Sequence, residues 1–308
     1  MKSSLYVAMV SALAVMACGG NRNPVVDDET FSYQDYEVNC PVKSIDFRSY
    51  EATSKFGDVI KGDPTYGNYL AEFNAVGNIV KKTEYMKDGE IFLVYRYVYD
   101  DLDNLAEWIV YSGTGEQSSM TKMEYNADGD QIRWTRYGED SKMQACCDME
   151  YSQGYKVKSV REDYEDSTKV VQKWIFKREG PRVLEAYNYT DDVLKSVFMY
   201  SKYDEKGIIE GVEYDGNDAK ISEFRFEYNP DGYLMKATSV SSVDDSEHEL
   251  LIERNDKNLP LHNMNSENDP VDTYYEYEYD EKGNWVRRVE FEGIIKKPVE
   301  IVERTIAY

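Results

Sequence analysis

The sequence predicts an all-β protein in which about 18–20 antiparallel strands follow one another as a meander. The strands are expected to form a curled, open single sheet made of tandem hairpin repeats of about 26 residues each. Three observations lead to this prediction. A turn motif recurs at a regular interval, apolar and polar residues alternate between the turns, and no segment keeps a helical periodicity.

The first residues are expected to form a bacterial lipoprotein signal peptide. Lys2 precedes an apolar stretch at 5–16, which is too short to span a membrane but suits a secretory signal. The segment ending Val-Met-Ala-Cys at 15–18 resembles the lipobox of bacterial lipoproteins. This resemblance implies cleavage before Cys18, attachment of lipid (palmitate) to that cysteine and a membrane anchor. The alternative is an ordinary signal peptide with an incidental cysteine.

The chain is therefore divided into a signal peptide at 1–17, a lipidated cysteine with a flexible tether at 18–44, and a repeat domain at 45–308. The expected location is the cell envelope, at the periplasmic or outer face of the outer membrane. The net charge is −23, and removing residues 1–17 takes away one lysine and no acidic residue. Such a chain repels nucleic acid, so nucleic-acid binding is not expected.

The repeat is visible in five related stretches. They read FNAVGNIVKKTEY (73–85), YNADGDQIRWTRY (125–137), YDEKGIIEGVEY (203–214), YNPDGYLMKATSV (228–240) and YDEKGNWVRRVEF (279–291). The first position of the motif recurs every 25 to 27 residues, at Phe73, Tyr99, Tyr125, Tyr151, Phe176, Tyr203, Tyr228, Arg254 and Tyr279. A second aromatic lies near mid-period, at Tyr85, Tyr111, Tyr137, Tyr164, Tyr214 and Phe291, so each repeat holds two strands and two turns.

The recurring Asp/Asn and Gly letters are explained by turn chemistry. The Asp280 side chain can start a type I turn, and Gly283 can take the left-handed conformation that closes a hairpin with a bulge. The turn glycines predicted in this way are Gly77, Gly129, Gly207, Gly232 and Gly283.

Period-2 alternation predicts what each face of a strand carries. At 275–279 the tyrosines share one face and the two glutamates share the other. After the turn, the same reasoning places Trp285, Val289 and Phe291 on one face with Arg287, while Arg288 and Glu290 point away.

The motif is similar to the YD repeats of Rhs-type and teneurin proteins, which are common in lipoproteins of the Bacteroidota. The resemblance covers 45–308 and implies a β-hairpin repeat domain. Large family members form hollow shells, and Rhs cores end in a self-cleaving segment with a DPxGL-like motif. The last residues here, Ile306-Ala307-Tyr308, carry no such motif, so encapsulation and autoproteolysis are not expected. A MORN-like repeat is the alternative, but the paired turn signals favour YD repeats.

A sheet of this many strands must curl, because twisted sheets rarely exceed about ten strands while flat. A transmembrane barrel is an alternative with a similar alternation. It is disfavoured because strands such as YEYEY and WVRRVEF place charges at mid-strand on the face that would meet lipid.

No motif predicts catalysis, and the protein is not expected to be an enzyme or to hold a metal or cofactor. His248 and His262 are interpreted as loop histidines. The segment 126–130 looks like part of a calcium loop but lacks its glycine and distal glutamate. Cys40, Cys146 and Cys147 are interpreted as ordinary cysteines, with a bridge to Cys40 as the main exception.

The aromatic columns are the feature with binding potential, because Tyr and Trp can stack on sugars or dock a protein. The sequence predicts a lipid-anchored binding module for a glycan or protein ligand, with Trp285, Trp134 and Trp108 as candidate ligand-binding residues. The alternative is a structural spacer or shell element without a ligand of its own.

Overall fold

The computed structural model describes residues 32, 36–165, 168–265 and 272–308, and in them 21 strands form one antiparallel sheet. The strands are β1 (Ser44–Lys55), β2 (Asp58–Pro64), β3 (Asn68–Phe73), β4 (Ile79–Tyr85), β5 (Ile91–Tyr99), β6 (Leu105–Ser112), β7 (Gln117–Tyr125), β8 (Gln131–Gly138), β9 (Met143–Ser152), β10 (Tyr155–Glu165), β11 (Thr168–Glu179), β12 (Arg182–Thr190), β13 (Val193–Tyr203), β14 (Ile208–Asp215), β15 (Lys220–Tyr228), β16 (Leu234–Ser241), β17 (Glu247–Arg254), β18 (Pro260–Asn265), β19 (Thr273–Tyr279), β20 (Trp285–Glu292) and β21 (Lys297–Ala307).

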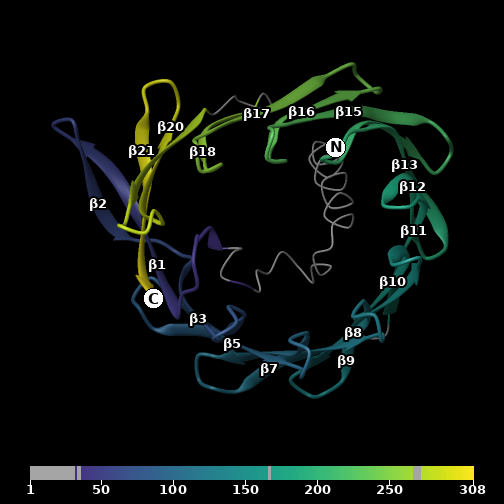
Figure 1. Cartoon of the computed structure of the whole chain (residues 1–308), viewed down its shortest axis with the longest axis horizontal. Coiled ribbons are helices and arrows are strands. Elements are labelled where there is room, and N and C mark those ends of the chain that lie inside the picture. Colours follow the sequence, from purple (N-terminus) through teal and green to yellow (C-terminus); the bar gives the residue numbers. More distant parts are fainter. Residues whose placement is uncertain (1–31, 33–35, 166–167, 266–271) are drawn as a thin grey trace.

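The sheet closes on itself, because the last strand pairs with the first. Phe47 of β1 faces Arg304 of β21 on one edge and Tyr69 of β3 on the other edge. β2 and β3 both pair with β1, at different heights along the same edge of that strand, and β2 extends beyond the ring (Figure 1). The two therefore count as one strand of the ring, and the 21 strands form a ring of 20 positions. At the usual strand spacing and tilt, such a ring has a backbone diameter of about 40 Å.

The predicted open sheet is therefore wrong, although the all-β class and the antiparallel meander are correct. Each hairpin is rotated slightly against its neighbour by the twist of the strands. Over the whole array this rotation brings β21 back to β1. The main-chain groups of these two strands, which would stay unpaired at the edges of an open sheet, then pair with each other.

The register separates an inner from an outer face. Residues 36–43 lie inside the ring and pack against the face that carries Phe47, Tyr69 and Tyr277 (Figure 1). Pairing from strand to strand places the tyrosines of β19 on this inner face, and Glu276 on the outer face. The alternation predicted for 275–279 is confirmed.

The face prediction for the strand after the turn is wrong at its first residue. A register shift at the start of the β19–β20 hairpin inserts one extra residue. Trp285 therefore lies on the inner face with Arg288, whereas Val289, Phe291 and Arg287 lie on the outer face. A bulge reverses the alternation, and simple period-2 counting cannot follow it.

The two sets of aromatics point in opposite directions. The mid-period tyrosines are on the outer face, and cations lie over the rings of Tyr85, Tyr111 and Tyr164. Arg48 lies 4.5 Å from the Tyr85 ring centroid, and Arg96 lies 5.4 Å from that of Tyr111. The motif tyrosines point inward, and several of their hydroxyls form hydrogen bonds to the main chain.

The inward tyrosines join each repeat to the one before it. The hydroxyl of a motif tyrosine donates to a main-chain carbonyl 20 residues earlier, at distances of 2.7–3.1 Å. The pairs are Tyr99 to Ile79, Tyr125 to Leu105, Tyr151 to Gln131, and Tyr228 to Ile208. The accepting residue is the first residue of its strand and lies beside the hairpin bulge. At a bulge the hydrogen-bond ladder between the two strands leaves main-chain groups unpaired. In the degenerate copy Arg254 makes the same bond, from its Nε to the carbonyl of Leu234 at 3.1 Å.

Tyr125→Phe is expected to lower the free energy of unfolding by about 1–2 kcal/mol, because it leaves the Leu105 carbonyl without its side-chain donor. Chemical denaturation measures this loss. Tyr111→Phe on the outer face is the matched control, and its expected change is below about 0.5 kcal/mol. Equal losses in the two variants would contradict a stapling role for the inward hydroxyls.

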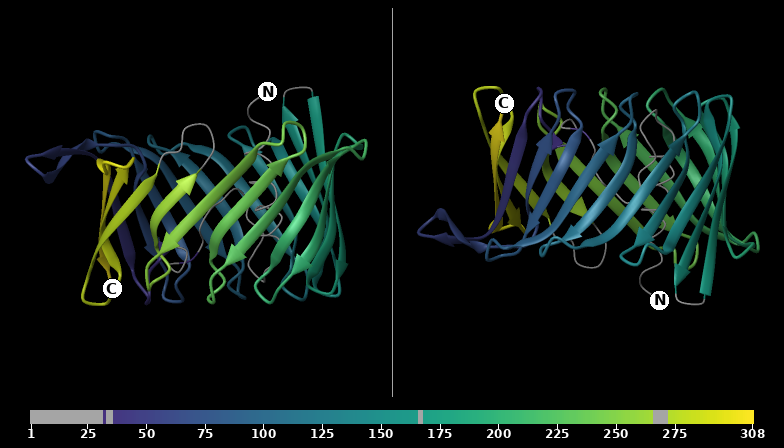
Figure 2. Two further views of the ribbon diagram at one scale, coloured as in Figure 1. Left: turned by 90° about the horizontal axis from the view of Figure 1, so that it is seen from above. Right: turned by 90° about the horizontal axis from the view of Figure 1, so that it is seen from below.

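The two ends of the ring differ in their turns (Figure 2). We call the end formed by the motif turns, such as 74–77 and 280–283, the motif rim. There the Asp280 carboxylate accepts from the main-chain N–H groups of residues 282 and 284. The φ angles of the turn glycines are 98° at Gly77, 85° at Gly129, 150° at Gly207, 86° at Gly232 and 78° at Gly283. Asp103 (φ 61°) and Asn258 (φ 62°) take the same place in other copies.

We call the opposite end the hairpin rim. It holds the tip of the β1–β2 hairpin at 56–57 and the turns between the remaining strand pairs, including 293–296. The β1–β2 hairpin projects outward from the ring at this rim (Figure 2). Ala52 and Val59 of this hairpin pack with Val289 and Ile301 on the outer face.

The described parts of the chain contain no helix that is long and apolar enough to cross a membrane. The outer face carries cross-strand ion pairs at mid-strand. Examples are Arg133 with Asp148 at 2.9 Å and Lys61 with Glu303 at 2.8 Å.

Candidate binding surface on the inner wall

The inner wall carries three clusters in which a cation lies against an aromatic ring and pairs with a carboxylate. The paired charged side chains in these clusters are 20–38 % exposed to solvent. Water therefore reaches these groups, whereas the apolar side chains around them are mostly buried. Such a wall presents charged groups, held against aromatic rings, that can pair with the charges of a ligand.

The first cluster surrounds Trp134. Arg136 from the same strand and Arg161 from β10 lie 6.0 and 5.6 Å from the indole ring centroid. Arg161 also forms a two-pronged pair with Asp163, with three N–O contacts of 2.9–3.0 Å. The indole is only 7 % exposed, so the guanidinium groups, and not the ring, are the atoms that a ligand would meet first.

The second cluster lies around Lys82 of β4. Its ammonium is 5.3 Å from the ring centroids of both Tyr69 and Tyr95, and it pairs with Glu84 at 2.9 Å. Tyr95 continues toward Trp108, whose ring centroid is 6.2 Å away. This part of the wall is therefore a row of packed aromatic side chains, with Trp108 buried in the core and Tyr69 and Tyr95 partly buried beside the Lys82 ammonium.

The third cluster lies near the closing strands. Arg288 stands over the Tyr275 ring at 5.6 Å and pairs with Glu300 at 3.3 Å. Ser49 donates its hydroxyl to the same glutamate at 2.5 Å. Burial raises the pKa of the neighbouring Glu290 carboxyl, and Arg288 partly opposes this.

Trp285, Trp134 and Trp108 all lie on the inner wall but in different places, and they are 4, 7 and 7 % exposed. Trp285 is enclosed by charged neighbours. Its indole N–H donates to Glu37 at 2.8 Å, and the Arg304 guanidinium lies 3.4 Å from its ring centroid. Burial lowers the pKa of Arg304 to about 10, so this arginine is charged at neutral pH.

The prediction that the two histidines stand in loops is wrong, because His248 lies on β17 and His262 on β18. They lie on opposite faces and do not meet. His248 is on the inner wall beside Ser246, and His262 stacks on Tyr274 outside, with ring centroids 4.3 Å apart. No group of three or more metal-ligating side chains occurs in the part of the chain that the structure describes. The Asn126 side chain accepts from main-chain N–H groups of its own turn.

The three described cysteines are free. Cys146 points outward and Cys147 inward beside Trp134, in agreement with the alternation expected for neighbouring strand residues. Burial raises the pKa of the Cys147 thiol to about 11, which makes it a poor nucleophile at neutral pH. Cys18 and the signal peptide predicted at 1–17 lie outside the described residues.

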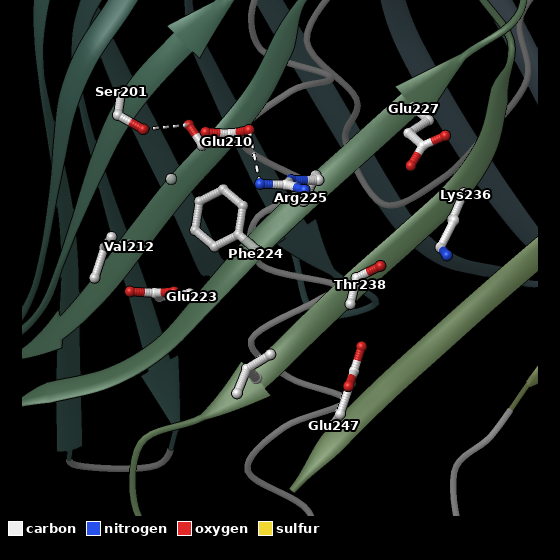
Figure 3. A pocket seen from close by; sticks show the side chains of 12 residues that line it. Ser201, Glu210, Val212, Glu223, Phe224, Arg225, Glu227, Lys236, Thr238 and Glu247 are labelled. Atoms are coloured by element: carbon white, nitrogen blue, oxygen red, sulfur yellow. Dashed lines mark hydrogen bonds and ion pairs between the residues drawn. The ribbon is translucent and has the colours of Figure 1, made fainter. Parts of the chain in front are cut away.

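A second hollow lies on the outer face of β13–β17 and has a volume of about 470 Å³ (Figure 3). Arg225 pairs there with Glu210 at 3.0 Å, and Lys236 pairs with Glu249 at 2.6 Å. Four glutamates (Glu210, Glu223, Glu227 and Glu247) and only two cations (Arg225 and Lys236) line it, so negative charge is in excess there, and its lining brings together no aromatic stack like those inside the ring.

Sequence reasoning did not identify Arg136, Arg161, Lys82 or Arg288 as site residues. Their signal in the sequence is weak. Each is one of the alternate residues of its strand that point inward. Its aromatic partner, however, often comes from another strand, as Trp134 does for Arg161.

No family model matches this chain, and no curated protein matches it. Among solved structures it is similar to a porin-like protein from Bacteroides uniformis, with 11 % identity, 86 % of this chain and 96 % of that chain covered, and a TM-score of 0.36. A porin-like protein from Bacteroides vulgatus gives 12 % identity, 87 % and 99 % coverage and a TM-score of 0.24. The complex TcdB2-TccC3-TEV gives 8 % identity, 82 % and 19 % coverage and a TM-score of 0.26. Similarity at this level does not indicate what the chain does.

Proposed function

We propose that the protein is a binding module of the cell envelope. In this proposal a lipid on Cys18 holds it at the outer membrane, and the inner wall of the ring takes a glycan or protein segment that carries carboxylate groups. The lipobox-like segment and the YD-type repeats support the location. The observation that carries the binding proposal is the Trp134 cluster, where Arg136 and Arg161 lie against one indole on a water-reached wall.

The chemistry of the cluster favours a planar anion. A guanidinium group matches a carboxylate with two parallel hydrogen bonds, and an aromatic surface holds the guanidinium plane in place. Asp163 already shows this geometry, since it receives a two-pronged contact from Arg161. A ligand carboxylate would compete for, or add to, the same donors.

The test is a screen of acidic oligosaccharides and acidic peptides, followed by titration of whatever binds. Arg161→Gln and Arg136→Gln are expected to weaken binding by about 10–100-fold, because each removes a charge-assisted contact. Arg133→Gln is the matched control, because Arg133 makes a similar pair with Asp148 on the outer face of the same strand. An unchanged affinity in both inner variants would contradict the proposed site.

The second candidate is a structural spacer or shell element. The low exposure of Trp108, Trp134 and Trp285 favours it, because all three behave as core residues. A screen without any bound ligand, combined with large stability losses in the inner-wall variants, is the result expected for this candidate.

A further inference from the structure

The two rims differ in how they expose large apolar side chains. Of the six that are most exposed in the described chain, five belong to the hairpin rim and one, Leu102 at 79 %, to the motif rim. The five are Phe56 (96 %), Ile294 (89 %), Ile295 (88 %), Val243 (84 %) and Tyr66 (74 %). Scattered apolar residues are normal on a protein surface, but such concentration at one end marks a contact surface.

Three of the five are at the tips of two hairpins next to the closing strands. β1 and β21 pair until Glu51 meets Glu300, and beyond that point the β1–β2 hairpin turns outward. Phe56 forms its tip, and Ile294-Ile295 form the tip of the β20–β21 hairpin at the same rim. Ala52 and Val59 of the first hairpin belong to an apolar cluster with residues of β20 and β21, which holds the hairpin in this position.

Phe56 has a backbone conformation that a bulky side chain rarely adopts. Phe56 and Gly57 have φ angles of 56° and 92°, the two consecutive left-handed residues of a two-residue hairpin turn. Asn and Gly favour such positions, whereas a bulky side chain is disfavoured there. Since Phe56 is 96 % exposed, no burial within the chain compensates for this conformation. The side chain therefore points to a contact outside the chain.

We propose that the tips of the hairpin rim, Phe56 with Ile294 and Ile295, insert shallowly into the surface of a lipid bilayer. Exposed charges of both signs stand beside the two tips, namely Lys55, Lys296 and Lys297 together with Asp58 and Glu292. Lysine next to a buried apolar side chain can reach the phosphate of a lipid head group while its stem stays in the apolar layer.

The arrangement suits a fluid layer better than a folded partner. The apolar side chains stand on separate projecting tips and do not line a groove, so an acyl layer can accept each one without a matching pocket. The net charge of −23 opposes strongly anionic bilayers, so the surface that fits is one of zwitterionic lipids. This inference goes beyond the ligand proposal, and it depends neither on the inner wall nor on acylation of Cys18.

The test places a reporter at the tip. In the full chain, Phe56→Trp adds an exposed indole to tryptophans that include three buried ones, at positions 108, 134 and 285. Vesicles of phosphatidylcholine and phosphatidylethanolamine should shift its emission to the blue, and brominated acyl chains should quench it. Leu102→Trp, the matched control on the motif rim, should show neither change. An absent shift at position 56, or equal quenching at both positions, would overturn the proposal.

A second measurement uses loss of the tips. The triple variant Phe56→Ser, Ile294→Ser, Ile295→Ser should bind the same vesicles on the order of tenfold more weakly or worse, since it removes most of the inserted apolar area. Its melting temperature should equal that of the parent chain because the three side chains are exposed. Val76→Ser with Leu102→Ser on the motif rim should leave vesicle binding unchanged. Unchanged binding in the triple variant, or binding to a soluble protein in place of vesicles, would refute insertion.

Discussion

Trp285→Ala is expected to lower the free energy of unfolding by about 3–5 kcal/mol, the usual range for deleting a buried aromatic side chain. The indole is 4 % exposed and lies where the ring closes. It contacts Phe47 of β1 and Arg304 of β21, and it bonds Glu37 of the segment that enters the ring. Removing the indole leaves a cavity, and the buried Arg304 guanidinium loses the aromatic ring that it lies against.

Thermal or chemical denaturation measures this loss, and the inner-wall ligand screen run on the same variant separates a core residue from a binding residue. Phe56→Ala is the control, because that side chain is almost fully exposed and should cost no stability. A Trp285→Ala protein that keeps its melting temperature but loses a ligand would show that Trp285 binds, and that the ring closes without it.

Raising the pH above about 10 is expected to unfold the protein cooperatively, because the inward tyrosines resist ionisation. Burial raises the pKa of Tyr125, Tyr203 and Tyr228 to about 12, and it also raises the pKa of Tyr99 and Tyr277. The folded state thus favours the neutral phenol. Its contribution to stability is complete below the unfolded pKa of about 10 and is lost as the pH rises toward 12.

Phenolate absorbance and circular dichroism, followed together through an alkaline titration, test this expectation. A group of tyrosines should ionise in the same transition in which the β signal is lost. The titration is repeated at high salt, which screens repulsion between surface charges but leaves the burial of the phenols unchanged. Complete ionisation of all tyrosines while the β signal persists would contradict burial as the cause.

The sequence by itself determined the local structure. Asp280 and Gly283 specify a turn through bonds within five residues, and the alternation at 275–279 assigns its tyrosines and glutamates to opposite faces. These features depend on contacts between near neighbours in the chain, so they can be predicted from the residue types and their spacing. The number of strands followed from the same signals.

Only the tertiary structure decided that the sheet closes, which face is inside and which residues meet there. Closure depends on small rotations summed over all hairpins, and no single repeat carries that sum. Aromatics occur on both faces, as Tyr277 and Phe291 show, so composition could not identify the inner wall. One bulge moved Trp285 to the inner face, and pairing across β8, β9 and β10 brought Arg161 to Trp134. Contacts between strands depend on register and curvature, which are set by the whole ring and not by any stretch of its sequence.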